Sequence, residues 1–293
     1  MKIKQTNGER IFNVVNILFM LVMILLTLYP MIYLVFAAFS NPREFMMHEG
    51  LLVKPLGFSL VSFEAVFKNP NILSGYTNTI IVVACGVALN IFMTVLGAYF
   101  LSRKGVMLNK VITLFIIFTM YFHGGLIPFY LTVRNLHLDN SLLALIIPGA
   151  INTFNLIIMR TAFAAIPDSM EESAKLDGAS HMTILTRIMI PLALPTVAVL
   201  VLYYGVYHWN AWFNAMIFIR KREMFPLQLV LREIIIQNST SDMTLGADTG
   251  EMQMLSETIK YAVIIVATVP ILALYPFLQK YFVKGVMVGA VKG

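Results

Sequence analysis

Six long stretches without a charged side chain constrain the fold of this chain more than any other feature. These uncharged, mostly apolar runs cover 11–42, 69–102, 111–133, 140–159, 188–219 and 261–279. A helix of about 20 apolar residues crosses the roughly 30 Å hydrocarbon core of a bilayer. The runs therefore predict six transmembrane helices, near 11–38, 75–101, 111–131, 141–160, 193–215 and 261–279.

The composition agrees with a lipid environment. The chain is 59% hydrophobic and only 12% charged, whereas soluble domains have about 25% charged residues. A chain with so few charged residues cannot cover the surface of a soluble protein with polar groups. We therefore predict an all-α integral membrane protein with one transmembrane domain over 1–293. The single cysteine, Cys85, lies in an apolar run, which gives no support to disulfides or cysteine-ligated metals.

The charged residues lie between the apolar runs and indicate topology. The net charge of +6 is spread along the chain, which argues against a nucleic-acid partner. With both termini in the cytoplasm, 12 of the 21 lysines and arginines lie on the inner side, although 220–222 is a basic exception outside. The first run is longer than the roughly 7–15 apolar residues of a secretory signal, so we expect it to remain as a span.

The segment between the fourth and fifth spans, 167–191, is longer than a simple connection and is predicted to form two short cytoplasmic helices. Ser169 and Glu172 have the spacing of a capping box, and Gly178 lies where a left-handed residue would end the first helix. The second helix is predicted from near 180 to 190. A solvated hairpin in which Glu172 only caps the helix is one interpretation. Small Ser173 and Ala174, beside an exposed Gly178, favour a docking element instead.

The same segment resembles the EAA loop of ABC importer permeases. That loop has E-A-A, three residues, G, about nine residues and then I-x-L-P, and here 172–179 (ESAKLDGA) is followed by 188–191 (IMIP) and Pro195. Ser173 replaces the usual first alanine and Ile190 the usual leucine, and both changes keep size and polarity similar.

Further matches extend this resemblance over nearly the whole chain. They are Asn78 with Thr79, 125–128 (GLIP), 209–213 (WNAWF), and the tail segments 281–285 (YFVKG) and 289–293 (GAVKG). Together they resemble the carbohydrate-uptake permeases of the maltose-permease G type, above all those for complex plant-polysaccharide oligosaccharides in Firmicutes.

The resemblance implies a non-enzymatic permease subunit that imports sugars, in particular oligosaccharides, across the bacterial plasma membrane by alternating access. The partners it implies are a second homologous permease subunit in a heterodimer, a cytoplasmic ATPase dimer and an extracytoplasmic sugar-binding protein. No Walker-type G-K-[ST] sequence occurs in the chain. We therefore expect no cofactor here, with ATP and Mg²⁺ bound by the partner ATPase.

Residue roles follow from the same resemblance. Glu172 is implied to pair with the ATPase, and Gly178 to permit the turn of this coupling helix. The remaining contact candidates in the coupling loop 167–191 are Ser173, Ala174, Asp177 and Ala179. The tail is implied to reach between the two ATPase subunits through Lys284, Gly285, Gly289 and Lys292, and a frayed terminus is the alternative.

Amide and aromatic side chains within the spans are candidates for the sugar path. An unpaired amide in hydrocarbon is unfavourable, so such groups should face the bundle or a wet cavity. The aromatic residues also fit an interfacial belt or helix packing, and His123 and His208 fit structural histidines. The resemblance implies that the outer loop 220–257 contacts the sugar-binding protein, with the loop 41–72 as a second candidate, and a flexible loop without such a contact is the alternative. The path candidates are Asn152, Asn155, Tyr204, Trp209, Asn210 and Trp212.

Two other classes of function compete with this interpretation. An ion-coupled secondary transporter subunit would favour buried carboxylates or an internal repeat, and an intramembrane enzyme would place ionisable groups inside spans. The six runs contain no Asp, Glu, Lys or Arg, and no repeat is visible. A permease driven by a partner's ATP hydrolysis fits the sequence better.

Overall fold

The computed structural model describes residues 6–237, 255–273 and 276, and within these ranges the regular secondary structure is helical, with one isolated bridge between Ser40 and Phe58. This confirms the predicted all-α fold. The chain divides into two compact units, Met1–Asn69 with Ile234–Thr268, and Pro70–Glu233 with Val269–Gly293.

The first unit is dominated by α1 (Asn7–Ala38). Thr6 and Glu9 form a capping box at its start, and none of its most apolar 18-residue window is buried within the chain. Such a helix requires lipid or another subunit around it. Near its far end, Tyr33 meets Tyr261 edge-on, with 5.9 Å between ring centroids. The other helices of this unit are α2 (Pro42–Met46), α3 (Val61–Lys68) and most of Leu255–Ala273.

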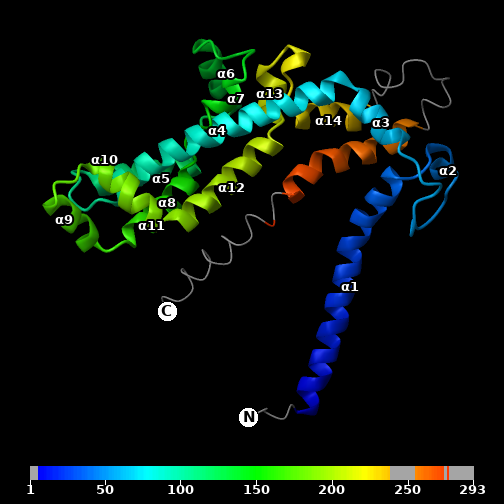
Figure 1. The fold of residues 1–293 in the computed structure, drawn as a ribbon, viewed down its shortest axis with the longest axis horizontal. Helices are drawn as coiled ribbons and strands as arrows, with labels where there is room; N and C mark the ends of the chain where they lie inside the picture. Colours follow the sequence, from blue (N-terminus) through cyan, green and yellow to red (C-terminus); the bar gives the residue numbers. More distant parts are fainter. Residues whose placement is uncertain (1–5, 238–254, 274–275, 277–293) are drawn as a thin grey trace. The chain divides into compact units, whose positions relative to one another are not determined.

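The second unit is built on α4 (Pro70–Ser102), which lies alongside α12 (Leu194–Asn210) and α8 (Thr153–Ala164), as Figure 1 shows. The shorter helices of this unit are α5 (Asn109–Tyr121), α6 (Leu126–Asn135), α7 (Leu143–Ile146), α9 (Asp168–Leu176), α10 (His181–Ile184), the π-helix η1 (Leu185–Met189), α11 (Ile190–Leu192), α13 (Phe213–Phe218), the 3₁₀ turn η2 (Arg222–Met224) and α14 (Leu227–Gln237), whose end passes into the first unit.

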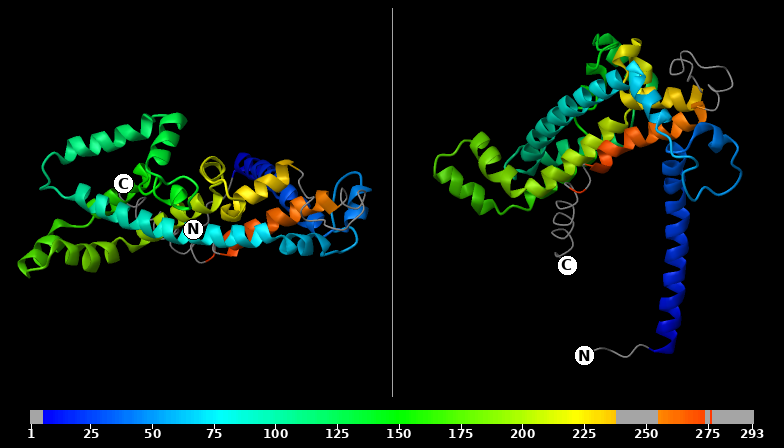
Figure 2. Two further views of the ribbon diagram at one scale, coloured as in Figure 1. Left: turned by 90° about the horizontal axis from the view of Figure 1, so that it is seen from above. Right: turned by 45° about the vertical axis from the view of Figure 1, so that its right-hand side comes forward.

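Several predicted spans are interrupted. By length and composition, three described helices can cross a membrane: α1, α4 and Leu255–Ala273. Two bent pairs raise this number to five, namely α5 with α6 at 113° (Figure 2, left) and His181–Leu192 with α12 at 84°. Gly125, with φ 86°, lies at the first bend, and Pro195 near the start of α12 cannot donate a helical hydrogen bond. The count of six stays a prediction.

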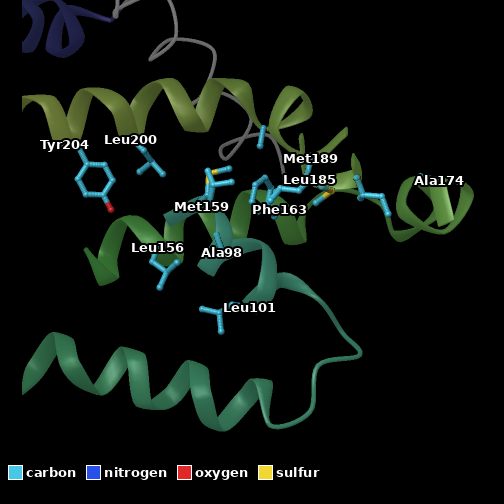
Figure 3. Close-up of a cluster of buried hydrophobic side chains, with 13 residues drawn as sticks. Ala98, Leu101, Leu156, Met159, Phe163, Ala174, Leu185, Met189, Leu200 and Tyr204 are labelled. Atoms are coloured by element: carbon cyan, nitrogen blue, oxygen red, sulfur yellow. The ribbon is translucent and has the colours of Figure 1, made fainter. Parts of the chain in front are cut away.

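A buried cluster joins the long helices to the 167–191 segment. The cluster includes Leu101 from α4, Phe163 from α8, Leu200 from α12 and Met189 from η1 (Figure 3). These four side chains are at most 2% exposed. The 167–191 segment is therefore attached to the helix bundle by its own apolar side chains.

Candidate functional site

The first helix of the 167–191 segment is α9, and it begins two residues earlier than a capping box of Ser169 and Glu172 would require. Its N-cap is Pro167, and no side chain caps it. Ser169 is already the second helical residue, so the predicted capping role of Ser169 and Glu172 is wrong. Asp168 and Glu171 lie in the first turn, where negative charge is favourable next to the helix dipole.

The turn that follows α9 has the geometry of a Schellman motif. Gly178 has φ 78°, the left-handed conformation expected from the sequence. Its amide donates to the carbonyl of Lys175 at 3.0 Å, and the amide of Ala179 donates to that of Ala174 at 2.9 Å. Ser180 then caps the next helix through its hydroxyl. Residues 167–191 thus form a helix, a glycine turn and a second helix.

The two faces of this segment differ in character. Ala174, Ile184 and Met189 are buried in the cluster of Figure 3, so Ala174 packs within its own chain. The opposite side exposes Glu172, Ser173 and Asp177, and Leu176 is 90% exposed. The exposed side of α9 is thus mostly polar, with Leu176 as an apolar side chain among these groups.

Two adjacent glutamates of α9 point to different surroundings. Glu171 is buried and forms ion pairs with Arg103, just after α4, and with Lys175 at 2.8 Å. Glu172 is exposed, and within the described residues it has no hydrogen bond or ion pair. Glu171 thus carries the contacts with both cations, and the exposed Glu172 carboxylate, which also attracts Lys104, is accessible to a cation from outside the chain.

A second ion pair links the same two regions at the surface. Lys104 donates to the Asp168 carboxylate at 2.5 Å, and both side chains are more than half exposed. The hydrogen bond lowers the pKa of Asp168 and raises the pKa of Lys104. Both groups therefore stay charged around neutral pH.

A cavity of about 660 Å³ opens among α5, α8, α12 and α13. Amides, hydroxyls and aromatic rings line it, and none of the described lining residues is Asp, Glu, Lys or Arg. A dry, apolar ligand site would not need so many hydrogen-bonding groups. The polar and aromatic lining consists of Thr119, His123, Phe129, Asn152, Thr153, Phe154, Asn155, Tyr203, Tyr204, Tyr207 and Asn214.

Backbone and side-chain hydrogen bonds hold one wall of this cavity in place. The Tyr204 hydroxyl lies 2.7 Å from the Thr94 hydroxyl and accepts from the Asn152 amide at 3.3 Å. The Asn152 side-chain oxygen accepts from the Asn155 amide at 3.0 Å and so caps α8. Tyr204 and Asn152 therefore have structural roles in addition to any contact with a ligand.

The comparisons with known proteins decide the family. Residues 93–288 match the family model described as "Binding-protein-dependent transport system inner membrane component". The chain belongs to this family. It is thus a bacterial membrane permease subunit of the ABC importer type, and the resemblance found in the EAA loop is confirmed.

Relatives and a solved structure align with almost the whole permease. A Bacillus subtilis polygalacturonan/rhamnogalacturonan transport system permease protein is 38% identical, over 97% of this chain and 99% of its own. Protein LplC of the same organism is 40% identical, over 98% and 97%. A permease chain from a bacterial ABC transporter involved in the import of the acidic polysaccharide alginate has a TM-score of 0.88 at 32% identity, covering 96% of this chain and 100% of that one.

Three of the predicted path residues of the permease, Asn152, Asn155 and Tyr204, line the cavity, and three do not. Trp209 is buried near Tyr76, with ring centroids 6.3 Å apart. Asn210 donates to the Val206 carbonyl of its own helix. Trp212 lies under the Arg232 guanidinium, which is 4.2 Å from the ring centroid.

His208 has the structural role expected of it in the permease. It is 1% exposed, and its Nε2 lies 2.7 Å from the Asn90 side-chain oxygen. The Asn90 side-chain amide in turn donates to the Gly149 carbonyl. The ring fits against α4 because Gly86 has no side chain.

Other predicted contacts of the permease fall on residues outside the described ranges. These are the tail positions Lys284, Gly285, Gly289 and Lys292, and much of the outer loop 220–257. Conversely, the sequence interpretation missed Arg103 and Glu171, because a basic residue between two apolar runs indicates topology before anything else. Two sequence features could have indicated this pair. Glu171 is a second acidic residue directly before Glu172, and Arg103 with Lys104 is a basic pair in the short segment 102–110 on the same predicted side of the membrane.

Proposed function

We propose that this permease imports acidic oligosaccharides, such as fragments of uronic acid polymers, and that the cavity of about 660 Å³ belongs to their path. The observation that carries the proposal is a lining rich in amides, hydroxyls and aromatic rings but free of carboxylates among the described residues. Two similar proteins point the same way, since one is named for polygalacturonan and the other for alginate.

The cavity chemistry fits this substrate class. Asn155 and Asn214 offer amides that donate to or accept from sugar hydroxyls, and the rings of Tyr203 and Tyr207 offer flat faces. A carboxylate on the wall would repel a uronate strongly in this poorly solvated place.

Replacing Asn214 with aspartate should test the absence of carboxylates. We expect uptake of an oligogalacturonate to fall about tenfold or more, since like charges repel by roughly 1–4 kcal/mol at close range. Uptake of a neutral oligosaccharide of equal length should change less. The matched control is Asn210→Asp on α12, outside the lining. Equal losses for acidic and neutral sugars in Asn214→Asp would contradict the acidic substrate class.

The free energy for transport is proposed to come from ATP hydrolysis by a partner ATPase dimer that binds ATP and Mg²⁺. Its closure would move α9 through contacts with Glu172, Ser173, Asp177, Gly178 and Ala179, and through the exposed side chain of Leu176. The tail residues Lys284, Gly285, Gly289 and Lys292 are proposed as a second contact. The contacts transmit work only if their energies differ between the inward-open and outward-open states.

A second, homologous permease subunit and an extracytoplasmic sugar-binding protein complete the proposed importer. The uncovered length of α1 supports a partner within the membrane. We expect the permease, purified in mild detergent, to co-purify with a second permease and the ATPase dimer. In liposomes, uptake should require all these chains and ATP. Uptake by this chain alone, driven by an ion gradient, would instead support an ion-coupled secondary transporter.

A further inference from the structure

The end of α4 and the side of α9 meet through a partly buried ion pair. The side chains of Arg103 and Glu171 are 15% and 10% exposed, respectively. The guanidinium also donates to the Ser102 hydroxyl at 3.0 and 3.1 Å and lies 5.0 Å from the centroid of the Tyr99 ring. The orientation of Arg103 is thus fixed from several sides.

The backbone that carries Arg103 is itself held firmly. The side-chain amide of Asn109 donates to the carbonyls of Leu101 and Arg103 at 3.0 and 2.8 Å. Arg160 from α8 donates to the same Leu101 carbonyl at 3.1 Å. A displacement of α9 that pulls on Arg103 therefore reaches α4 directly, without a flexible loop in between.

The neighbouring pair Lys104–Asp168 joins the same two regions but lies in solvent. Exposed ion pairs contribute little to the stability of a protein, because water and salt screen the attraction between their charges. Removing one partner of a buried pair is more damaging, and loss of Arg103 would leave Glu171 with only the half-exposed Lys175 as a partner. Arg103 and Lys104 are adjacent, so substituting each in turn compares a partly buried ion pair with a solvent-exposed one.

We propose that Arg103 is a positioning residue for energy coupling, whose ion pair with Glu171 fastens α9 to the end of α4. This inference rests on the proposed function and adds the route by which motion of α9 enters the longest helix of the second unit. Glu172 faces the outside partner, while Glu171 connects the same helix to its own chain. The apolar side chains of Ala174, Ile184 and Met189 keep the segment folded when the pair is lost.

The test uses the complete importer in liposomes and compares Arg103→Gln with Lys104→Gln. The quantity measured is the number of sugars imported per ATP hydrolysed, together with the amount of assembled complex. For Arg103→Gln we expect this ratio to fall by roughly 2- to 30-fold, the range typical of residues that couple two sites. ATP hydrolysis should continue, and Lys104→Gln should keep the wild-type ratio.

Two further variants make the outcome decisive. Glu171→Gln should lower the ratio as Arg103→Gln does, and the double variant should be no worse than either single one, because the two residues act as a unit. If Arg103→Gln does not assemble, Glu171→Gln decides the question. If an assembled variant imported as many sugars per ATP as the wild type, the proposed role of Arg103 would be overturned, while the proposed function would stand. Failure of the wild-type complex to import sugar would instead overturn the proposed function.

Discussion

Replacing Gly178 with proline is expected to abolish sugar import while the isolated partner ATPase stays fully active. Gly178 has φ 78°, and proline is restricted to φ near −65°. Proline also removes the amide that donates to the Lys175 carbonyl. Together these changes should disfavour the turn by about 3 kcal/mol or more. Because the turn joins α9 to α10, its loss misplaces the exposed face of α9 on the proposed ATPase.

The measurement is ATP-driven uptake by reconstituted importer, with the amount of assembled complex determined in parallel. Gly178→Asn is the control, since asparagine enters the left-handed conformation more readily than most residues and keeps the amide donor. We expect this variant to retain most of the uptake. Wild-type uptake by Gly178→Pro would show that the turn does not position a coupling contact.

Gly86→Ala is expected to destabilise the second unit by disturbing its central seam. A methyl group at Gly86 would come within 2.5 Å of the His208 ring, which is buried and bonded to Asn90. Overpacking of this kind disfavours the folded state by about 1–3 kcal/mol. The displaced ring would also lose its hydrogen bond to Asn90, which anchors the Gly149 carbonyl beside the cavity.

Gly205→Ala provides the comparison, because no atom lies within 4 Å of the added methyl group. Alanine favours a helix over glycine by about 1 kcal/mol, so this variant should be at least as stable as the wild type. The readout is the thermal unfolding midpoint of the purified permease in detergent. Equal midpoints for Gly86→Ala and Gly205→Ala would contradict the proposed packing of His208 against α4.

The features that the sequence made predictable are those that depend on local chemistry. Long uncharged runs predicted α1 and α4, because a helix of that length without charge is stable only where lipid or protein surrounds it. The left-handed turn at Gly178 was predictable from a single residue, since glycine adopts that conformation far more easily than residues with a side chain. The EAA loop likewise placed Glu172 on a surface from its sequence pattern alone.

The features that sequence reasoning missed depend on packing between distant segments. Ser169 has the spacing of a cap, but the helix begins at Asp168, so the hydroxyl falls inside the helix. Nothing local distinguishes Glu171 from Glu172, and only the position of Arg103 does so. Likewise, Trp209 and Tyr204 look equivalent on one helix, yet only Tyr204 lines the cavity.

The two adjacent glutamates of α9 also differ in where the residue that each must pair with is encoded. Glu171 matches Arg103, so the same coding sequence holds both halves of that pair. Under the proposed function, Glu172 must match a residue encoded elsewhere, in the ATPase. An exchange of ATPases between two transport systems would therefore challenge Glu172 and leave Glu171 unaffected. Two neighbouring positions of one helix would therefore co-evolve with different partners, Glu171 with a residue of the same protein and Glu172 with a residue of the ATPase.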